Sequence, residues 1–312
     1  MSHNQSRHSF RCTRAGRLAS VRSIVPAVVL IACSCVFVWC CSGCVFGPPL
    51  EPYERDPRVI ALRNMGVGVG GTGGQVRKVE LIEDSLGDSV LRDIRTFESL
   101  EYLRINSAQV TGQGLKHLVG LRDLTDLLLY DSSVTDDNLK YLQAFPKLRR
   151  LDLDRTGTSN SGLKHLKALS SLEELHLSKT TITGVGLVNL RGLSKLRRLA
   201  LQDTGVDDNA LVNVEPLTRL TELNLGGTKI TDSGITHLRA LKDLELLVLQ
   251  RTQVSDAGLD QVRALKKLKT LDVRGTHVTR QHAIAIQQVL PFVEVLIGPM
   301  NGSEILPRMQ EP

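Results

Sequence analysis

At 312 residues, the chain is long enough for one or two ordinary domains, or for one elongated repeat domain. Hydrophobic residues make up 41% of the sequence but aromatic residues only 4%, so leucine rather than aromatic rings has to fill the core. Five arginines near the N-terminus account for five of the six units of net positive charge. The remainder therefore lacks the one-sided charge that binds nucleic acid.

Residues 1–44 predict an export signal. Five arginines precede an uncharged segment from Ser23 to Leu50, which gives the basic region, apolar run and small residues that are typical of a secretory signal. Because the arginines lie before the apolar run, we expect the N-terminus to stay in the cytoplasm and the remainder to be exported. All six cysteines lie in this leader, so the folded part is expected to contain neither a disulfide nor a thiolate metal site.

The end of the apolar run resembles a bacterial lipobox. Cys44 follows a Ser-Gly pair, and the resemblance implies that Cys44 becomes the lipidated first residue of the mature protein. Cys41 stands where that motif usually has leucine; residues 30–33 match its letters better, but only a short apolar run precedes Cys33. An uncleaved signal anchor is the alternative, because about 20 uncharged residues can span a bilayer. Both interpretations predict a membrane-anchored protein on the periplasmic or cell-surface side.

Three short elements are expected between the leader and the main domain. Residues 45–56 contain three prolines and are interpreted as a linker. Asp56-Pro57 is a typical helix start, so a capping helix is predicted over residues 58–65. The glycine-rich segment 66–81 lacks the Gly-Lys-Ser/Thr of a phosphate-binding loop, and we expect a β-hairpin there.

A repeat occupies most of the remaining chain. The pattern Leu-x-x-Leu-x-Leu, or a conservative variant, begins ten times between Val76 and Phe292, every 24 residues and without an insertion. Leu223 and Leu225 alternate as in a strand, whereas Ile235 and Leu238 have helical spacing. Each unit is therefore predicted to be a strand, a tight turn and a short helix, with a Thr-Asp pair at the helix start to cap it.

Stacking of these units predicts the fold class. One unit cannot bury its apolar face alone, whereas stacked units share a continuous core. Helices are wider than the roughly 4.8 Å between strands, so we expect an α/β right-handed solenoid, a horseshoe with a parallel sheet on its concave side and short helices on its convex side. Hydroxyls at the ninth position of each unit are expected to bond to the turn backbone. These residues are Thr156, Thr180, Thr204, Thr228, Thr252 and Thr276, preceded by Ser132.

The repeat resembles the leucine-rich-repeat family. The run Thr-x-Ile/Val-Thr-Asp-x-Gly-Leu-x-x-Leu is similar to the cysteine-containing, ribonuclease-inhibitor-like subtype, with threonine in place of cysteine. The resemblance covers about residues 57–298 and implies an interaction scaffold that binds a protein partner, with no enzymatic activity and no cofactor. Within that domain we expect a last helix over 281–290 and a last strand over 292–297, followed by a flexible tail over 299–312.

The outward-facing strand positions are the candidate partner-binding surface. Tyrosine and arginine are typical interface anchors. Leu246 and Val248 place apolar area where solvent is expected, beside Gly226 and Gly227, which predicts an apolar pocket. The residues that we expect to contact a protein partner are Tyr102, Arg104, Leu128, Tyr130, Arg150, Asp152, His176, Arg198, Leu246 and Val248.

Two sets of polar residues could instead carry chemistry. Asp152 and His176 hold the same position in adjacent predicted strands, with Asp154 and Ser178 two residues further on, a grouping similar to a hydrolase triad or a metal site. An open sheet supplies no oxyanion hole and excludes no water, so we predict neither. Three histidines share one position of the repeat but lie at least two repeats apart, too far to share an ion; they are His117, His165 and His237.

The sequence thus favours a membrane-anchored, extracytoplasmic protein that mediates protein–protein interaction. A structural cell-envelope protein that self-associates or contacts the wall is the alternative. A hidden hydrolase or a metal-binding protein is the third hypothesis.

Overall fold

The computed structural model describes residues 51–299 and 304–306. The leader, Cys44 and the other cysteines lie outside the described residues, so the export and lipidation predictions stay predictions. The described residues all belong to one compact unit. Within the described part, no helix combines the length and the apolar character that a membrane crossing requires.

A short helical segment and a hairpin close the N-terminal end of the core. The 3₁₀ turn η1 (Pro52–Arg55) leads into helix α1 (Pro57–Asn64), whose N-cap Asp56 accepts a hydrogen bond from the backbone N–H of Arg58 at 2.8 Å. Strands β1 (Gly68–Thr72) and β2 (Gln75–Leu81) follow as an antiparallel pair. Both the predicted capping helix and the predicted hairpin are confirmed.

The strands form one sheet in the order of the chain. Twelve strands pair consecutively among the described residues, and β2 to β11 are parallel. Partners along the parallel part are 24 residues apart, as in Leu151 and Leu175, so the sheet register equals the sequence period. The repeat strands are β3 (Tyr102–Ile105), β4 (Asp126–Leu128), β5 (Arg150–Asp152), β6 (Glu174–His176), β7 (Arg198–Ala200), β8 (Glu222–Asn224), β9 (Leu246–Val248), β10 (Thr270–Asp272) and β11 (Glu294–Ile297).

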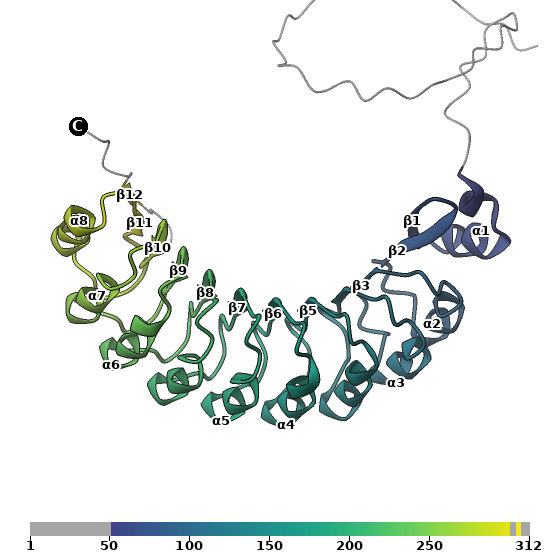
Figure 1. The fold of residues 1–312 in the computed structure, drawn as a ribbon, viewed down its shortest axis with the longest axis horizontal. Coiled ribbons are helices and arrows are strands. Elements are labelled where there is room, and N and C mark those ends of the chain that lie inside the picture. The colour runs from purple at the N-terminus through teal and green to yellow at the C-terminus, as the bar shows by residue number, and fades with distance from the viewer. Residues whose placement is uncertain (1–50, 300–303, 307–312) are drawn as a thin grey trace, which may run out of the picture. The chain divides into compact units, whose positions relative to one another are not determined.

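The helices lie on the convex side of the repeat unit and the strands on its concave side (Figure 1). Many units pair one α-helical turn with a 3₁₀ turn, since a 24-residue repeat leaves little length for a helix after its strand and two connections. The helical segments are α2 (Asp88–Ile94), α3 (Gly112–Leu115), η2 (Lys116–Leu118), η3 (Asp136–Ala144), α4 (Asn160–Leu163), η4 (Lys164–Ala168), α5 (Gly184–Leu187), η5 (Val188–Leu190), η6 (Asp208–Asn213), α6 (Asp232–Ile235), η7 (Thr236–Ala240), α7 (Asp256–Val262) and α8 (Arg280–Val289).

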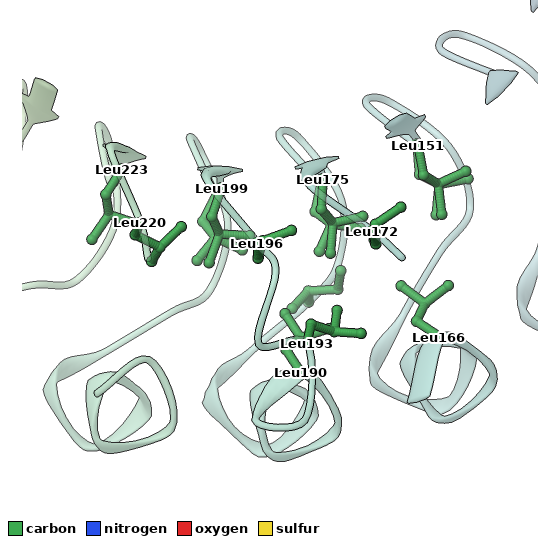
Figure 2. Packing of buried hydrophobic residues seen from close by; sticks show 14 of the residues in the cluster. Leu151, Leu166, Leu172, Leu175, Leu190, Leu193, Leu196, Leu199, Leu220 and Leu223 are labelled. Carbon is green, nitrogen blue, oxygen red and sulfur yellow. The ribbon is translucent and has the colours of Figure 1, made fainter. Parts of the chain in front are cut away.

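Leucines from strands and helices meet in one continuous core. Figure 2 shows Leu151, Leu175, Leu199 and Leu223 projecting from successive strands into the space between the sheet and the helices. Each of these side chains is at most 2% exposed. The predicted hydroxyl ladder is also confirmed: each ninth-position threonine donates its hydroxyl to the carbonyl three residues earlier, at 2.5–2.7 Å. Buried turn carbonyls are thereby satisfied.

A second ladder links the helix starts of neighbouring repeats, and the sequence analysis missed it. Asp208 accepts hydrogen bonds from the backbone N–H of Thr231, at 2.8 Å, and from its hydroxyl, at 2.6 Å. Thr231 in turn accepts from the N–H of Ser233 at 3.3 Å, as predicted for an N-cap. The same carboxylate-to-cap bond joins Asp88 to Thr111, Asp136 to Ser159, Asp232 to Ser255 and Asp256 to Thr279.

The C-terminal end differs from the sequence prediction. Helix α8 confirms the expected last helix, but β11 is not the last strand. Strand β12 (Glu304–Leu306) pairs antiparallel with β11, and Leu306 is buried. The prediction of a flexible tail over residues 299–312 is therefore wrong for residues 304–306. A three-residue strand carries no detectable alternation of its own, and it forms here because the edge of β11 offers unpaired backbone groups.

Candidate partner-binding face

The outward side chains of the parallel strands form one concave face. Alternation along each strand sends one residue into the core and the next outward. All ten residues predicted to contact a partner occupy this face: nine lie within strands β3 to β7 and β9, and Tyr130 lies two residues after the end of β4. Nine of them are half-buried by their neighbours, and Arg198 is exposed. The sequence therefore located the face correctly, whereas their role in binding stays a prediction.

An aromatic and cationic cluster occupies the N-terminal part of this face. Arg104 donates through Nε to the hydroxyl of Tyr130 at 3.1 Å, and its guanidinium lies 5.1 Å from the centroid of that ring. Asn106 donates to the same hydroxyl at 3.0 Å. The ammonium of Lys78 lies 5.0 Å from the ring centroid of Tyr102, and burial raises the pKa of the Tyr102 hydroxyl. These contacts hold two tyrosines in fixed orientations.

A row of alternating charges crosses the middle of the face. Asp126, Arg150, Glu174, Arg198 and Glu222 occupy equivalent positions on β4 to β8. Arg150 Nε lies 3.5 Å from Asp126 and 2.9 Å from Glu174; Arg198 lies 3.2 Å from Glu174 and 2.9 Å from Glu222. Two of the three predicted arginine anchors, Arg150 and Arg198, are thus already paired with acids, which the sequence analysis did not predict.

The pKa values follow from this row. Burial acts to raise the pKa of Glu174, but Arg150 and His176 outweigh it, so the pKa of that carboxyl lies below its usual value. The hydrogen bond to Glu222 raises the pKa of Arg198. Both shifts favour the charged forms of Glu174 and Arg198, which form an ion pair at the centre of the row.

A largely apolar hollow adjoins the C-terminal part of the charged row, and Glu174, Arg198 and Glu222 of that row also line it. Leu246, Val248 and Ala200 contribute its apolar lining, with polar neighbours that include Asn224, and its volume is about 230 Å³. The predicted pocket therefore exists, but it opens over Ala200 rather than beside Gly226 and Gly227. The side chain of Gln250 covers Gly226, because a β-carbon at that glycine would lie 2.8 Å from Gln250 Cγ.

Asp152, Asp154 and His176 come together beside Tyr130 of the tyrosine cluster, and His176 also lines the apolar hollow. Each offers one oxygen or nitrogen, and these atoms lie within 4.8 Å of one another, so these are the residues that could hold a metal ion. Burial raises the pKa of both aspartates. His176 Nε2 lies 2.9 Å from Glu174, and no hydrogen bond joins the imidazole to Ser178 within the described structure. A serine–histidine–aspartate relay is therefore not assembled.

The three histidines with a common repeat position lie on the helical side. His117 accepts a hydrogen bond from Arg92 at 3.4 Å, and His237 Nδ1 lies 2.6 Å from Glu215. Burial lowers the pKa of His117 and of His165. His117 and His237 therefore contact different partners on this side.

The regular stack of strand, turn and helix agrees with two family models. A model described as leucine rich repeat matches residues 146–206, and a second with the same description matches residues 217–238. The chain is a leucine-rich-repeat protein. The subtype of this leucine-rich-repeat protein, with threonine in place of cysteine, stays a prediction.

Several solved structures resemble this leucine-rich-repeat protein. Internalin C2 from Listeria monocytogenes str. 4b F2365 is 21% identical, covers 79% of this chain and 96% of its own, and gives a TM-score of 0.53. An internalin (inlF) of the same strain is 19% identical over 80% and 92%, with a TM-score of 0.45. The plant peptide hormone receptor RGFR1 in complex with RGF2 is 15% identical over 66% and 37%, with a TM-score of 0.47.

At these identities the likeness concerns the fold alone, and of these three structures internalin C2 supports it, with its TM-score above 0.5. No curated protein sequence matches the chain.

Proposed function

We propose that this leucine-rich-repeat protein is a membrane-anchored, extracytoplasmic module that binds another protein with its concave face. The leucine-rich-repeat fold suggests protein–protein interaction, which supports the general part of the proposal. Anchoring and export rest on the leader sequence, with Cys44 as the expected lipid attachment site.

The choice of the concave face rests on one observation: contacts within the protein itself already orient the side chains of this face. The tyrosine cluster and the charged row fix long side chains that would otherwise lose rotamer freedom on binding. The apolar hollow over Ala200 then offers area that a partner side chain can bury. Rigid polar surroundings with one apolar hollow favour a specific partner over a general polyanion or polycation.

The face is tested by cross-linking. The full chain in detergent micelles, with a photoreactive residue in place of Leu128 on the same concave face in every sample, is expected to cross-link one partner protein from envelope extracts. The double variant Leu246→Glu/Val248→Glu should reduce this capture at least about tenfold, because two carboxylates would replace the apolar area that the partner is expected to bury. The matched control is Val185→Glu on the convex side, where the side chain is 78% exposed.

Equal capture by the concave double variant and the convex control contradicts use of the concave face. Cross-links only between copies of this chain would instead support the self-associating envelope protein. The anchor is tested separately by mass spectrometry of the mature N-terminus, which should reveal a lipid-modified Cys44. An intact N-terminus that begins at Met1 would contradict lipidation and support a signal anchor.

A further inference from the structure

We propose that Asp152, Asp154 and His176 form a binding site for a zinc ion on the concave face. The three residues lie on two adjacent strands and the turn after the first. Asp152 and His176 are register partners of β5 and β6, and Asp154 follows two residues after Asp152 on the same side. One ligand atom from each residue lies within 4.8 Å of the other two. Zinc ligands at about 2.0–2.2 Å in tetrahedral geometry are about 3.3–3.5 Å apart, so small side-chain rotations bring the set together.

Each of the three side chains is fixed through one atom and keeps another available for a ligand. Asp152 Oδ1 accepts the backbone N–H of Asp154 at 2.9 Å, and Asp154 Oδ1 accepts the backbone N–H of Ser178. His176 Nε2 lies 2.9 Å from Glu174 Oε1, which leaves Nδ1 for the metal. A histidine held by a carboxylate through its second nitrogen is the usual arrangement around a protein-bound metal, because it fixes the tautomer and the ring orientation.

The two aspartates of this group also differ from the remaining concave acids in their ion pairing. Asp126, Glu174 and Glu222 are paired with arginines, and so is Asp272, which holds the position of Asp152 five strands away. Neither Asp152 nor Asp154 forms an ion pair with any lysine or arginine that the structure describes. Two half-buried carboxylates side by side are costly without a counter-charge.

The donor set selects the class of ion. One imidazole with two carboxylates suits zinc and similar first-row ions, whereas magnesium prefers oxygen ligands and octahedral geometry. An open hollow of about 340 Å³ borders the two aspartates, together with Tyr130, Asp131 and Arg155. Water therefore reaches the site and can complete the coordination sphere. Three protein ligands with a solvent-accessible fourth position match an open rather than a closed zinc site.

The test measures thermal unfolding of the full chain in detergent micelles, with zinc chloride as the only added probe. Because free thiols are zinc ligands and all six cysteines lie in residues 1–44, the readout is the unfolding of the repeat domain followed by circular dichroism, compared among variants. In the unaltered protein, Tm should rise with zinc concentration, as it does for any ligand that binds the folded state alone. Magnesium chloride at the same concentrations should give no rise.

The variants separate metal ligation from general stability. His176→Asn and Asp154→Asn should each abolish the zinc-dependent rise; both are expected to fold, because Asn224 already occupies the position equivalent to His176 two repeats later. Glu174→Gln should raise the zinc concentration at half-effect by about 10- to 100-fold, since it only orients the imidazole. Asp272→Asn, which removes a concave carboxylate that Arg274 neutralises, should change the basal Tm but keep the full zinc-dependent rise.

The outcomes are decisive in both directions. Loss of the zinc effect in His176→Asn and Asp154→Asn, with its retention in Asp272→Asn, supports the site. Absence of any zinc effect in the unaltered protein, an equal effect of magnesium, or an unchanged effect in His176→Asn overturns it. The readout needs no partner protein, so failure of this site leaves the proposed binding function untouched.

Discussion

At the scale of single residues, the turn after each strand imposes the strictest backbone demand. The residue before the ninth-position threonine or serine has a left-handed conformation in seven repeats, with φ between 54° and 67°. Glycine serves twice, as Gly227 and Gly275, and other residues occupy the position in the remaining five: Asp131, Arg155, Lys179, Asp203 and Arg251. L-residues adopt this conformation at a cost of about 1–2 kcal/mol, so the stack tolerates strain that glycine would relieve.

Gly227→Ala tests this demand. We expect the free energy of unfolding to fall by about 1–2 kcal/mol, because alanine disfavours the left-handed conformation. Its β-carbon would also lie 2.2 Å from Asp203 Oδ1, which has to move. Urea denaturation provides the measurement, and Lys179→Ala is the control, because a non-glycine residue already holds that turn. Equal effects of the two substitutions would contradict the interpretation.

The hydroxyl ladder gives a second prediction at this scale. Thr204 donates its hydroxyl to the carbonyl of Leu201 at 2.6 Å within the buried turn. Thr204→Val keeps the volume but leaves this carbonyl without that donor, so we expect a loss of about 1–3 kcal/mol in urea denaturation. Thr221→Val removes a similar bond, from Thr221 to Arg197, in an exposed setting, and should change stability by less than about 0.5 kcal/mol. A smaller loss for Thr204→Val than for Thr221→Val would refute the role of burial.

At the scale of strands and helices, contacts between equivalent positions of neighbouring repeats govern the molecule. The charged row joins β4 to β8, and the aspartate ladder joins successive helix starts. The sequence period predicted which residues become neighbours, but it did not lead us to either pattern of bonds. Asp208 contacts Thr231 because stacking brings together residues that are 23 positions apart in the sequence. The hydrogen bond between them depends on how closely neighbouring repeats pack.

The charged row predicts a dependence of stability on pH. The folded pKa of Glu174 lies below the reference value of 4.5, so its stabilising contribution is present above pH 4.5 and is lost as the pH falls through the folded pKa. Glu174→Gln should therefore be less stable at pH 7 and lose less stability than the unaltered protein below pH 4.5. Urea midpoints measured across this range test the slope. Glu98→Gln, at an exposed glutamate outside the row, should reproduce the unaltered slope.

At the scale of the whole stack of repeats, the stability of each repeat depends on the repeats next to it. Each repeat contacts mainly the ones before and after it, so a solenoid behaves as a one-dimensional array with a shared core. The capping hairpin and strand β12 close its two ends. A defect in the middle should therefore weaken nearby repeats most and leave distant ones protected.

Leu175→Ala tests this propagation. The side chain is fully buried between neighbouring repeats, so we expect the free energy of unfolding to fall by about 2–5 kcal/mol. Hydrogen exchange should accelerate most in β5, β6 and β7 and least in β2 and β10. Val185→Ala, at a side chain that is 78% exposed, serves as the control and should change neither quantity appreciably. Uniform acceleration across all strands would show that the unit opens as a single block instead.

The unbroken period explains how much could be predicted from the sequence. A register equal to 24 residues fixed the strands, the concave face and the proximity of Asp152 to His176. Strand β12 was not predicted because it lies outside the repeat period and forms through its pairing with β11. The pairing of Arg150 and Arg198 with acids, and the cover that Gln250 places over Gly226, depend on rotamers, which spacing alone does not specify.

The equality of register and period has a further consequence for the length of the domain. Removing any 24 consecutive interior residues joins a strand, turn or helix to the matching point of the next unit, so both closing ends keep their neighbours. Duplicating 24 consecutive interior residues likewise inserts one repeat without disturbing the register of the others. The domain can therefore lengthen or shorten by whole 24-residue repeats without any change to its closing ends. Each repeat that is gained or lost adds or removes the outward side chains of one strand from the concave face.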